Sequence, residues 1–152
     1  MIRFVIVIAI SFIGMELISY LIHRFIYHKI LWAIHKSHHS PRTGPFELND
    51  VFPLIFAALS VVLMALGLRQ EGASDLLATS IGIMAYGSIY FIVHDLYVHR
   101  RVKAIRLRIP LLLPLKKAHA IHHRYGEEPY GLLFFVHPRR VAQETVGDDD
   151  AV

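Results

Sequence analysis

Three long apolar runs alternate with polar, histidine-rich segments along the chain. The runs cover residues 4–22, 51–68 and 76–93, and Glu16 is the only charged residue inside the first of them. An α-helix rises about 1.5 Å per residue, so each run is long enough to cross a hydrocarbon core about 30 Å thick. The pattern therefore predicts three transmembrane helices. The first run is too long for a signal peptide and has no small-residue cleavage site after it, so we expect it to stay as a helix.

Two further apolar stretches, residues 109–115 and 130–136, are too short to span a membrane. The first also carries Pro110 and Pro114. We expect them to form a short, broken or re-entrant fourth element, which a membrane tolerates only where protein covers the backbone. The predicted fold class is therefore an all-α, polytopic helical membrane protein. Residues 1–140 would form one integral-membrane domain, and residues 141–152 a polar tail that we expect to be disordered.

Ten of the eleven histidines fall into four groups that repeat along the chain. Two groups are pairs five residues apart, and two are triplets with the spacing i, i+3, i+4. The pairs are His23 with His28 and His94 with His99; the triplets are His35, His38 and His39, and His119, His122 and His123. Only His137 lies outside this pattern, and we expect it to have an ordinary interfacial or hydrogen-bonding role.

The spacing of the triplets is that of neighbouring residues on one face of a helix, so each triplet can hold one metal ion. The pairs are different, because five residues turn ~140° around a regular α-helix. Either the helix ends just after His23 and His94, or a π-type widening occurs there, as is often found at functional sites. Three crossings would place all four groups on one side of the membrane.

Composition limits the chemistry of a metal site here. The chain has no cysteine, and 55% of its residues are hydrophobic, so thiolate sites are excluded and imidazole is the plentiful ligand. Ten imidazoles exceed the four ligands of a closed zinc site and suit two metals with open coordination positions. Zinc, copper, iron and nickel all bind imidazole, so the spacing does not identify the metal.

The basic residues lie mostly on the histidine side of the predicted helices. Residues 23–50 hold four Lys or Arg and the region after His94 holds ten, whereas the other side has only Arg3 and Arg69. The positive-inside rule then makes the histidine side cytoplasmic. The basic run most simply binds anionic lipid headgroups, with docking of an acidic ferredoxin as a weaker hypothesis; its members are Arg100, Arg101, Lys103, Arg106, Arg108, Lys116 and Lys117.

Four polar residues are candidates to orient the histidine ligands through hydrogen bonds without binding the metal themselves: Glu16, Asn49, Asp50 and Asp95. Glu16 lies within the apolar run, where a carboxylate is costly, and we expect a hydrogen bond to a ligand or to another helix rather than metal binding. Asp95 can accept the free N–H of His94, although a solvated aspartate is an equal alternative. Asn49 and Asp50 can cap the second helix or orient a ligand.

Several of these segments resemble the bacterial and archaeal β-carotene hydroxylases of the fatty acid hydroxylase and sterol desaturase superfamily. The similarity covers roughly residues 12–135. It rests on the order and spacing of the histidine groups, on the contexts of Trp32 and Glu16, and on the segments 46–50 and 85–99. The segments 106–115 and 129–137 follow the family only loosely, so the substrate pocket is the least defined part.

The resemblance implies a non-haem di-iron centre held by the ten histidines, with O2 as co-substrate and zinc as a possible substitute metal. It also implies electrons from a ferredoxin-like donor, hydroxylation of C3 on the rings of β-carotene to give β-cryptoxanthin and zeaxanthin, and a prokaryotic cytoplasmic membrane as the location. No nucleic-acid partner is expected, and the oligomeric state is left open.

Two alternatives remain. One is a related oxygenase acting on a fatty acid, a sterol or another carotenoid. The other is a metal or haem carrier, but a transporter needs ligands near the bilayer midplane and a cytochrome needs two ligands per haem, whereas these groups follow helix ends on one side.

Overall fold

The computed structural model describes residues 1–72, 74–105 and 107–133, and every regular element in these ranges is a helix. In chain order these are α1 (Ile2–Ile22) with its π-helical continuation η1 (His23–Ile30), α2 (Trp32–His35), the 3₁₀ turn η2 (Leu48–Asp50) leading into α3 (Val51–Gly67), α4 (Asp75–Tyr90) with its π-helical continuation η3 (Phe91–Val98), and the 3₁₀ turn η4 (Pro110–Leu112) leading into α5 (Leu113–Tyr125). The predicted all-α class is confirmed.

Three continuous helical stretches are long and apolar enough to cross a membrane. They run over Ile2–Ile30, Leu48–Gly67 and Asp75–Val98. Their outward-facing side chains are apolar and exposed, as lipid contact requires; Ile10 and Ile13, for example, are 65% and 60% exposed. The three predicted transmembrane helices are therefore present.

Helix α4 packs against both α1 and α3. The core of this contact holds the buried side chains of Met15, Ile83 and Tyr86. At Gly82 an added Cβ would lie 2.6 Å from the Cβ of Ser11 and 2.7 Å from the carbonyl oxygen of Ile8, so only glycine allows α1 and α4 to approach this closely. Ser74 begins α4 by accepting the backbone N–H of Leu76 on its hydroxyl (3.2 Å).

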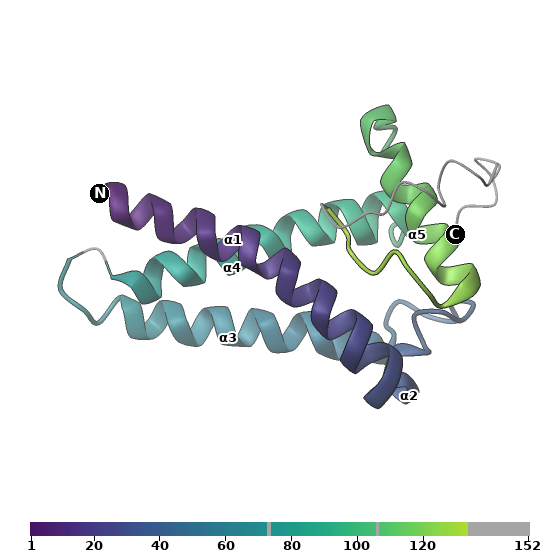
Figure 1. Cartoon of the computed structure of the whole chain (residues 1–152), viewed down its shortest axis with the longest axis horizontal. Helices are drawn as coiled ribbons and strands as arrows, with labels where there is room; N and C mark the ends of the chain where they lie inside the picture. Colours follow the sequence, from purple (N-terminus) through teal and green to yellow (C-terminus); the bar gives the residue numbers. More distant parts are fainter. Residues whose placement is uncertain (73, 106, 134–152) are drawn as a thin grey trace.

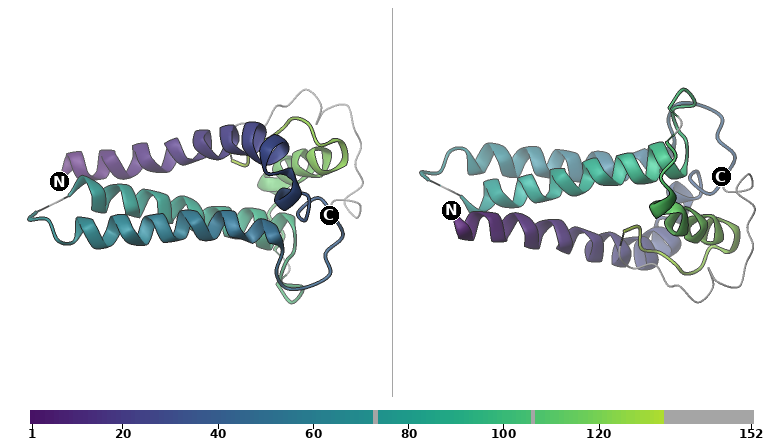
Figure 2. Two further views of the ribbon diagram at one scale, coloured as in Figure 1. Left: turned by 90° about the horizontal axis from the view of Figure 1, so that it is seen from below. Right: turned by 90° about the horizontal axis from the view of Figure 1, so that it is seen from above.

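The two ends of the bundle are formed by different segments of the chain (Figures 1 and 2). The N-terminus and the connection between α3 and α4 lie at one end, where Arg3 pairs with Asp75. The opposite end carries η1, η3, α2 and α5, and with them all ten histidines of the repeated groups. The prediction that the four groups share one side is confirmed.

The fourth element is a short helix at the histidine end. Pro110 is the first residue of η4 and Pro114 the second residue of α5, and in the first turn of a helix a missing N–H costs little. The chain then leaves α5 at Gly126, whose φ of 69° favours glycine, and residues 127–133 run back toward the bundle. Residues 134–136, His137 and the tail 141–152 lie outside the described residues.

Candidate metal centre

The two histidine pairs lie on the two π-helical segments. The five-residue hydrogen bonds of a π-helix join the Leu31 N–H to the Ile26 carbonyl (2.8 Å) and the His99 N–H to the His94 carbonyl (2.9 Å). This wider turn brings residues five apart onto one face, so the ring centroids of His94 and His99 lie 4.5 Å apart. Of the two alternatives that the spacing left open, the structure has the π-type widening.

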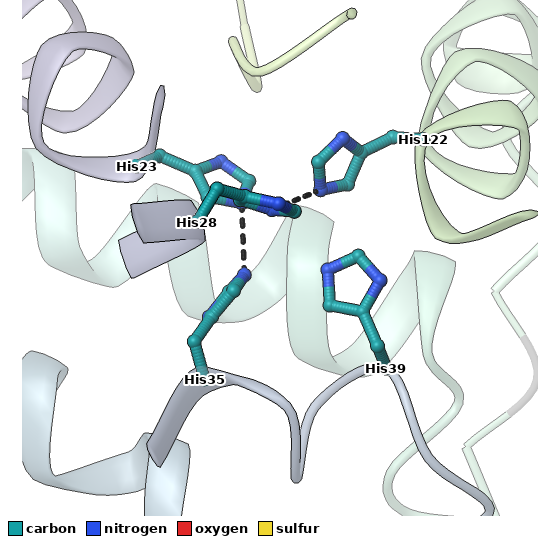
Figure 3. Close-up of side chains that lie close together, drawn as sticks. All are labelled: His23, His28, His35, His39 and His122. Atoms are coloured by element: carbon teal, nitrogen blue, oxygen red, sulfur yellow. Dashed lines mark hydrogen bonds between the residues drawn. The ribbon is translucent and has the colours of Figure 1, made fainter. Parts of the chain in front are cut away.

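Five imidazoles converge at one point, which we call the first cluster. One ring nitrogen of each lies within 4.8 Å of the others: His23, His28, His35, His39 and His122. The Nε2 atom of His28 lies 3.2 Å from that of His23 and 3.1 Å from that of His122 (Figure 3). Four of these residues come from the first half of the chain, and His122 comes from α5.

A second cluster lies beside the first. It contains His38, His99, His119 and His123, again with one ring nitrogen of each within 4.8 Å of the others. The Nε2 atoms of His99 and His119 are 2.8 Å apart. Here one residue, His38, comes from the first half of the chain, so each cluster combines both halves of the repeated pattern.

His94 stands at the edge of the second cluster. Its ring centroid lies 4.8 Å from that of His119 and 4.9 Å from that of His38. Its Nε2 atom faces the Tyr90 hydroxyl at 3.3 Å, while Nδ1 faces Asp95 at 2.7 Å. The structure therefore brings nine of the ten predicted ligands into two compact sets and holds the tenth next to them.

Hydrogen bonds at the outer edge of the first cluster indicate that three of its five rings direct the lone pair of Nε2 toward the centre of the cluster. The Nδ1 atoms of His23, His35 and His122 lie 2.9, 2.7 and 2.6 Å from the Tyr130 carbonyl, the Asn49 Oδ1 and the Glu127 carbonyl. These oxygens can only accept, so each Nδ1 carries the hydrogen. Lone pairs about 3 Å apart repel each other unless a cation lies among them, so the first cluster fits a metal ion.

The second cluster fits a metal for a related reason. The buried Nε2 atoms of His38, His39 and His123 have no hydrogen-bond partner within the described ranges. Buried polar atoms are normally paired, and an unpaired one calls for an explanation such as an ion. His39 belongs to the first cluster and the other two to the second, so both clusters show this sign.

Burial keeps the imidazoles neutral and thus able to bind a metal. Removal from water lowers the pKa of His35 and of His122 to about 3, and that of His123 to about 2. The pKa values of His38 and His119 are also lowered, first by burial and then by the neighbouring imidazoles. A neutral ring offers its lone pair at neutral pH without first losing a proton.

Two of the four candidate supporting residues, Asn49 and Asp95, lie within hydrogen-bond distance of a histidine. Asn49 accepts from His35, and Asp95 accepts from His94. Asp50 instead accepts the Glu47 backbone N–H (3.0 Å), which completes a capping box, and it also pairs with Arg101 at 2.6 Å. Asp50 therefore closes the 3₁₀ turn η2, but its side chain makes no cap hydrogen bond to α3, contrary to the expectation for the second helix, and no described hydrogen bond joins it to a histidine.

Glu16 makes the interhelical hydrogen bonds expected for a carboxylate in an apolar layer. It is fully buried, and its Oε2 accepts from the Tyr86 hydroxyl on α4 at 2.8 Å. Its Oε1 accepts the backbone N–H groups of Leu132 and Leu133 at 2.9 and 2.8 Å. Glu16 thus joins α1, α4 and the segment that follows α5.

Three charged residues have positions that the sequence did not predict. Glu47 lies 3.3 Å from Nδ1 of His38. Arg101 bridges Asp95 (2.8 Å) and Asp50, so it belongs to the interior of the site and not to a basic surface. Lys116 is also buried, at 5% exposure, which corrects its place in the predicted basic surface.

The chain is similar to known proteins of one family. Residues 8–139 match the family described as fatty acid hydroxylase. A β-carotene hydroxylase of Pantoea ananas is 42% identical over 133 residues, which cover 84% of this chain and 75% of that protein. No solved structure matches.

Two plant relatives are longer. A chloroplastic β-carotene 3-hydroxylase of an Oncidium hybrid is 43% identical over 80% of this chain and 42% of its own length. β-Carotene 3-hydroxylase 1 of Arabidopsis thaliana is 37% identical over 91% of this chain and 45% of its own length. The chain thus spans less than half the length of these plant proteins. With the family match and the bacterial relative, the chain belongs to the fatty acid hydroxylase family.

Proposed function

We propose that this protein is a membrane non-haem di-iron monooxygenase that hydroxylates C3 of the β-ionone rings of β-carotene. The observation that carries the proposal is the pair of adjacent imidazole clusters, one of five histidines and one of four, at one end of three membrane-length helices. The names of the similar proteins, β-carotene hydroxylase and β-carotene 3-hydroxylase, supply the substrate and the position. The products would be β-cryptoxanthin and then zeaxanthin.

The reaction needs a redox-active metal. Replacing the ring C–H by C–O–H with O2 takes up two electrons and two protons and releases one water. Zinc has no redox chemistry, so it could occupy the clusters but not support turnover. Iron bound to these histidines would supply O2 activation, as is usual where the cofactor carries the chemistry and the protein positions it.

The protein's own residues then have three roles. The neutral imidazoles of both clusters hold the metals. Asn49 and the carbonyls of Glu127 and Tyr130 fix the orientation of three rings in the first cluster. The apolar outer surfaces of α1, α3 and α4 let a polyene approach from the lipid.

We further propose that an acidic, ferredoxin-like protein delivers the electrons to the histidine end. Arg100, Lys103 and Arg108 are exposed there and remain available, whereas Arg101 and Lys116 are not. Arg106, also in the basic run, lies outside the described residues. Anionic headgroups of the surrounding lipid would compete for the same side chains.

The histidine end would face the cytoplasm of a prokaryotic cell, as the distribution of basic residues suggests. Because the chain contains no cysteine, a single introduced cysteine reports its side without background. In intact cells, Lys103→Cys should resist a membrane-impermeant maleimide, and Glu71→Cys in the loop at the other end should react. The reverse labelling would contradict this orientation.

The test of function is expression in cells that accumulate β-carotene, followed by pigment chromatography. Wild-type protein should yield zeaxanthin, and His38→Ala should abolish it at equal protein level. His137→Ala, outside the repeated groups, is the matched control and should retain activity. Unchanged β-carotene with wild-type protein and a supplied electron donor would remove the carotenoid assignment.

A further inference from the structure

The segment after α5 supplies two of the acceptors that orient the first cluster. We call residues 126–133 the return segment, which runs from the end of α5 back toward the bundle (Figure 1). Its Glu127 carbonyl lies 2.6 Å from Nδ1 of His122, and its Tyr130 carbonyl lies 2.9 Å from Nδ1 of His23. One short stretch of backbone therefore sets the tautomer of two rings that come from opposite ends of the chain.

Side chains of α1 and η1 hold the outer part of the return segment. The Oε1 atom of Glu128 accepts from the Tyr20 hydroxyl at 2.9 Å and from the Arg24 guanidinium at 2.6 Å. This contact is partly exposed, with Arg24 and Glu128 side chains 41% and 36% accessible. An ion pair so open to water holds position only weakly.

Glu16, whose side chain is fully buried, holds the inner part of the return segment. Leu132 and Leu133 lie in a bend beside the buried part of α1 and belong to no helix, so their N–H groups need acceptors from elsewhere in the protein. A single oxygen of Glu16 accepts both, at 2.9 and 2.8 Å, while the other oxygen accepts from Tyr86. An ionised carboxylate has only acceptor sites, which suits three converging donors.

We propose that Glu16 is a positioning residue for the first cluster, acting through the backbone of the return segment. Glu16 lies seven residues before His23, about 10 Å deeper along α1. By fixing residues 132 and 133, it keeps the Tyr130 carbonyl against His23 and thereby aims the Nε2 atom of His23 into the cluster. The inference rests on the proposed function only in requiring that the clusters bind metal.

The effect should be confined to one of the two metals. No described hydrogen bond joins the return segment to His38, His99, His119 or His123. Their rings lie against one another: the centroids of His38 and His99 are 4.3 Å apart, those of His119 and His123 are 4.5 Å apart, and the Nε2 atoms of His99 and His119 are 2.8 Å apart. Loss of Glu16 should therefore weaken the first cluster and leave the second cluster as an internal control for correct folding.

Two substitutions distinguish the effect of the hydrogen bonds of Glu16 from the effect of its side-chain volume. Glu16→Met keeps the length of the side chain but leaves two buried N–H groups without an acceptor. Glu16→Gln retains a carbonyl oxygen that can accept both N–H groups. Ser80→Ala on α4 is the matched control: Ser80 is also buried among apolar helices, but its hydroxyl hydrogen bond within the described residues is to the Leu77 carbonyl of its own helix (2.7 Å).

The experiment is a titration of the full-length, metal-free protein in detergent with Co²⁺, followed by visible absorption and metal analysis after dialysis. Wild type, Glu16→Gln and Ser80→Ala should bind two Co²⁺ per chain. Glu16→Met should bind the Co²⁺ of the second cluster with unchanged affinity. It should bind the Co²⁺ of the first cluster at least about tenfold more weakly, as is found when a hydrogen-bond partner of a metal ligand is removed. The absorption lost should match that lost in His122→Ala and not that lost in His119→Ala.

Two tight sites in Glu16→Met, or loss of both sites, would overturn the positioning role, because the first outcome shows no effect and the second shows no selectivity. Wild-type protein that binds no Co²⁺ would instead contradict the proposed function, and the inference with it.

Discussion

The Nε2 atoms of His28 and His122 lie 3.1 Å apart, although 94 residues separate them in the chain. His28 stands on the π-helical end of the first membrane helix, and His122 stands on α5. The first cluster is therefore complete only when the two halves of the chain are packed together. Metal binding and folding of this end should be linked, as they are in other sites assembled from distant segments.

A first prediction follows because both halves of the chain contribute ligands to the first cluster. His28→Ala and His122→Ala should each reduce bound metal from about two ions to about one per chain, since either loss removes part of the same cluster. Metal analysis of purified protein measures this directly. His122→Ala protein that keeps two ions, or that loses the same ion as His119→Ala, would contradict the assignment of His122 to the first cluster.

A second prediction concerns Arg101. It pairs with Asp95 and with Asp50, and its side chain is only 16% exposed. Arg101→Gln leaves two carboxylates without their cation and should lower the free energy of unfolding by about 3 kcal/mol. Lys103→Gln, an exposed neighbour, should change it by less than about 0.5 kcal/mol. Thermal unfolding in detergent measures both, and equal stability of the two variants would show that the bridge contributes nothing.

Acid should destabilise the metal-free protein. The folded-state pKa values of His35 and His122 are about 3, against an ordinary value of 6.5. Below pH 6.5 the unfolded chain takes up protons that the folded chain does not, so stability is present above that pH and is lost as the pH falls. The loss between pH 7 and 5 should be up to about 2 kcal/mol per such histidine. A melting temperature that stays constant over this range would contradict the buried, neutral state of these rings.

Much of the architecture follows from the sequence because the signals are local. Length and apolarity alone identify the three membrane helices. Counting the crossings along the chain then puts the four histidine groups on one side of the membrane. The recurrence of the five-residue spacing predicted either a helix end or a π-helix, and the structure has the π-helix at both His23 and His94. Asp95 could be identified because it follows His94 directly in the sequence, and Asn49 because it lies just before the second membrane helix.

Other parts of the site have no local signal. The acceptors for His23 and His122 are backbone carbonyls, which any residue provides, so only the path of the return segment reveals them. Arg101 was assigned to a basic surface because six neighbours share its charge, but packing turns it toward Asp50. His94 is adjacent to the second cluster and not within it because Tyr90 lies against its Nε2.

A fourth prediction concerns the docking of the electron donor. If Arg100, Lys103 and Arg108 dock an acidic ferredoxin, turnover with purified donor should fall steeply as salt rises from 0.05 to about 0.5 M, since screening shortens the reach of exposed charges. Replacing the three with Gln should lower the rate at low salt and flatten this dependence. A flat dependence in the wild type would show that docking does not use this surface.

The most direct test of a di-iron centre is the metal content of protein purified from iron-supplied cells that convert β-carotene. We predict about two iron atoms per chain, falling to about one in His122→Ala and in His119→Ala, with different iron lost in each as resolved by Mössbauer spectra. Active protein with two zinc ions and no iron, or with a single iron that survives both substitutions, would contradict the account.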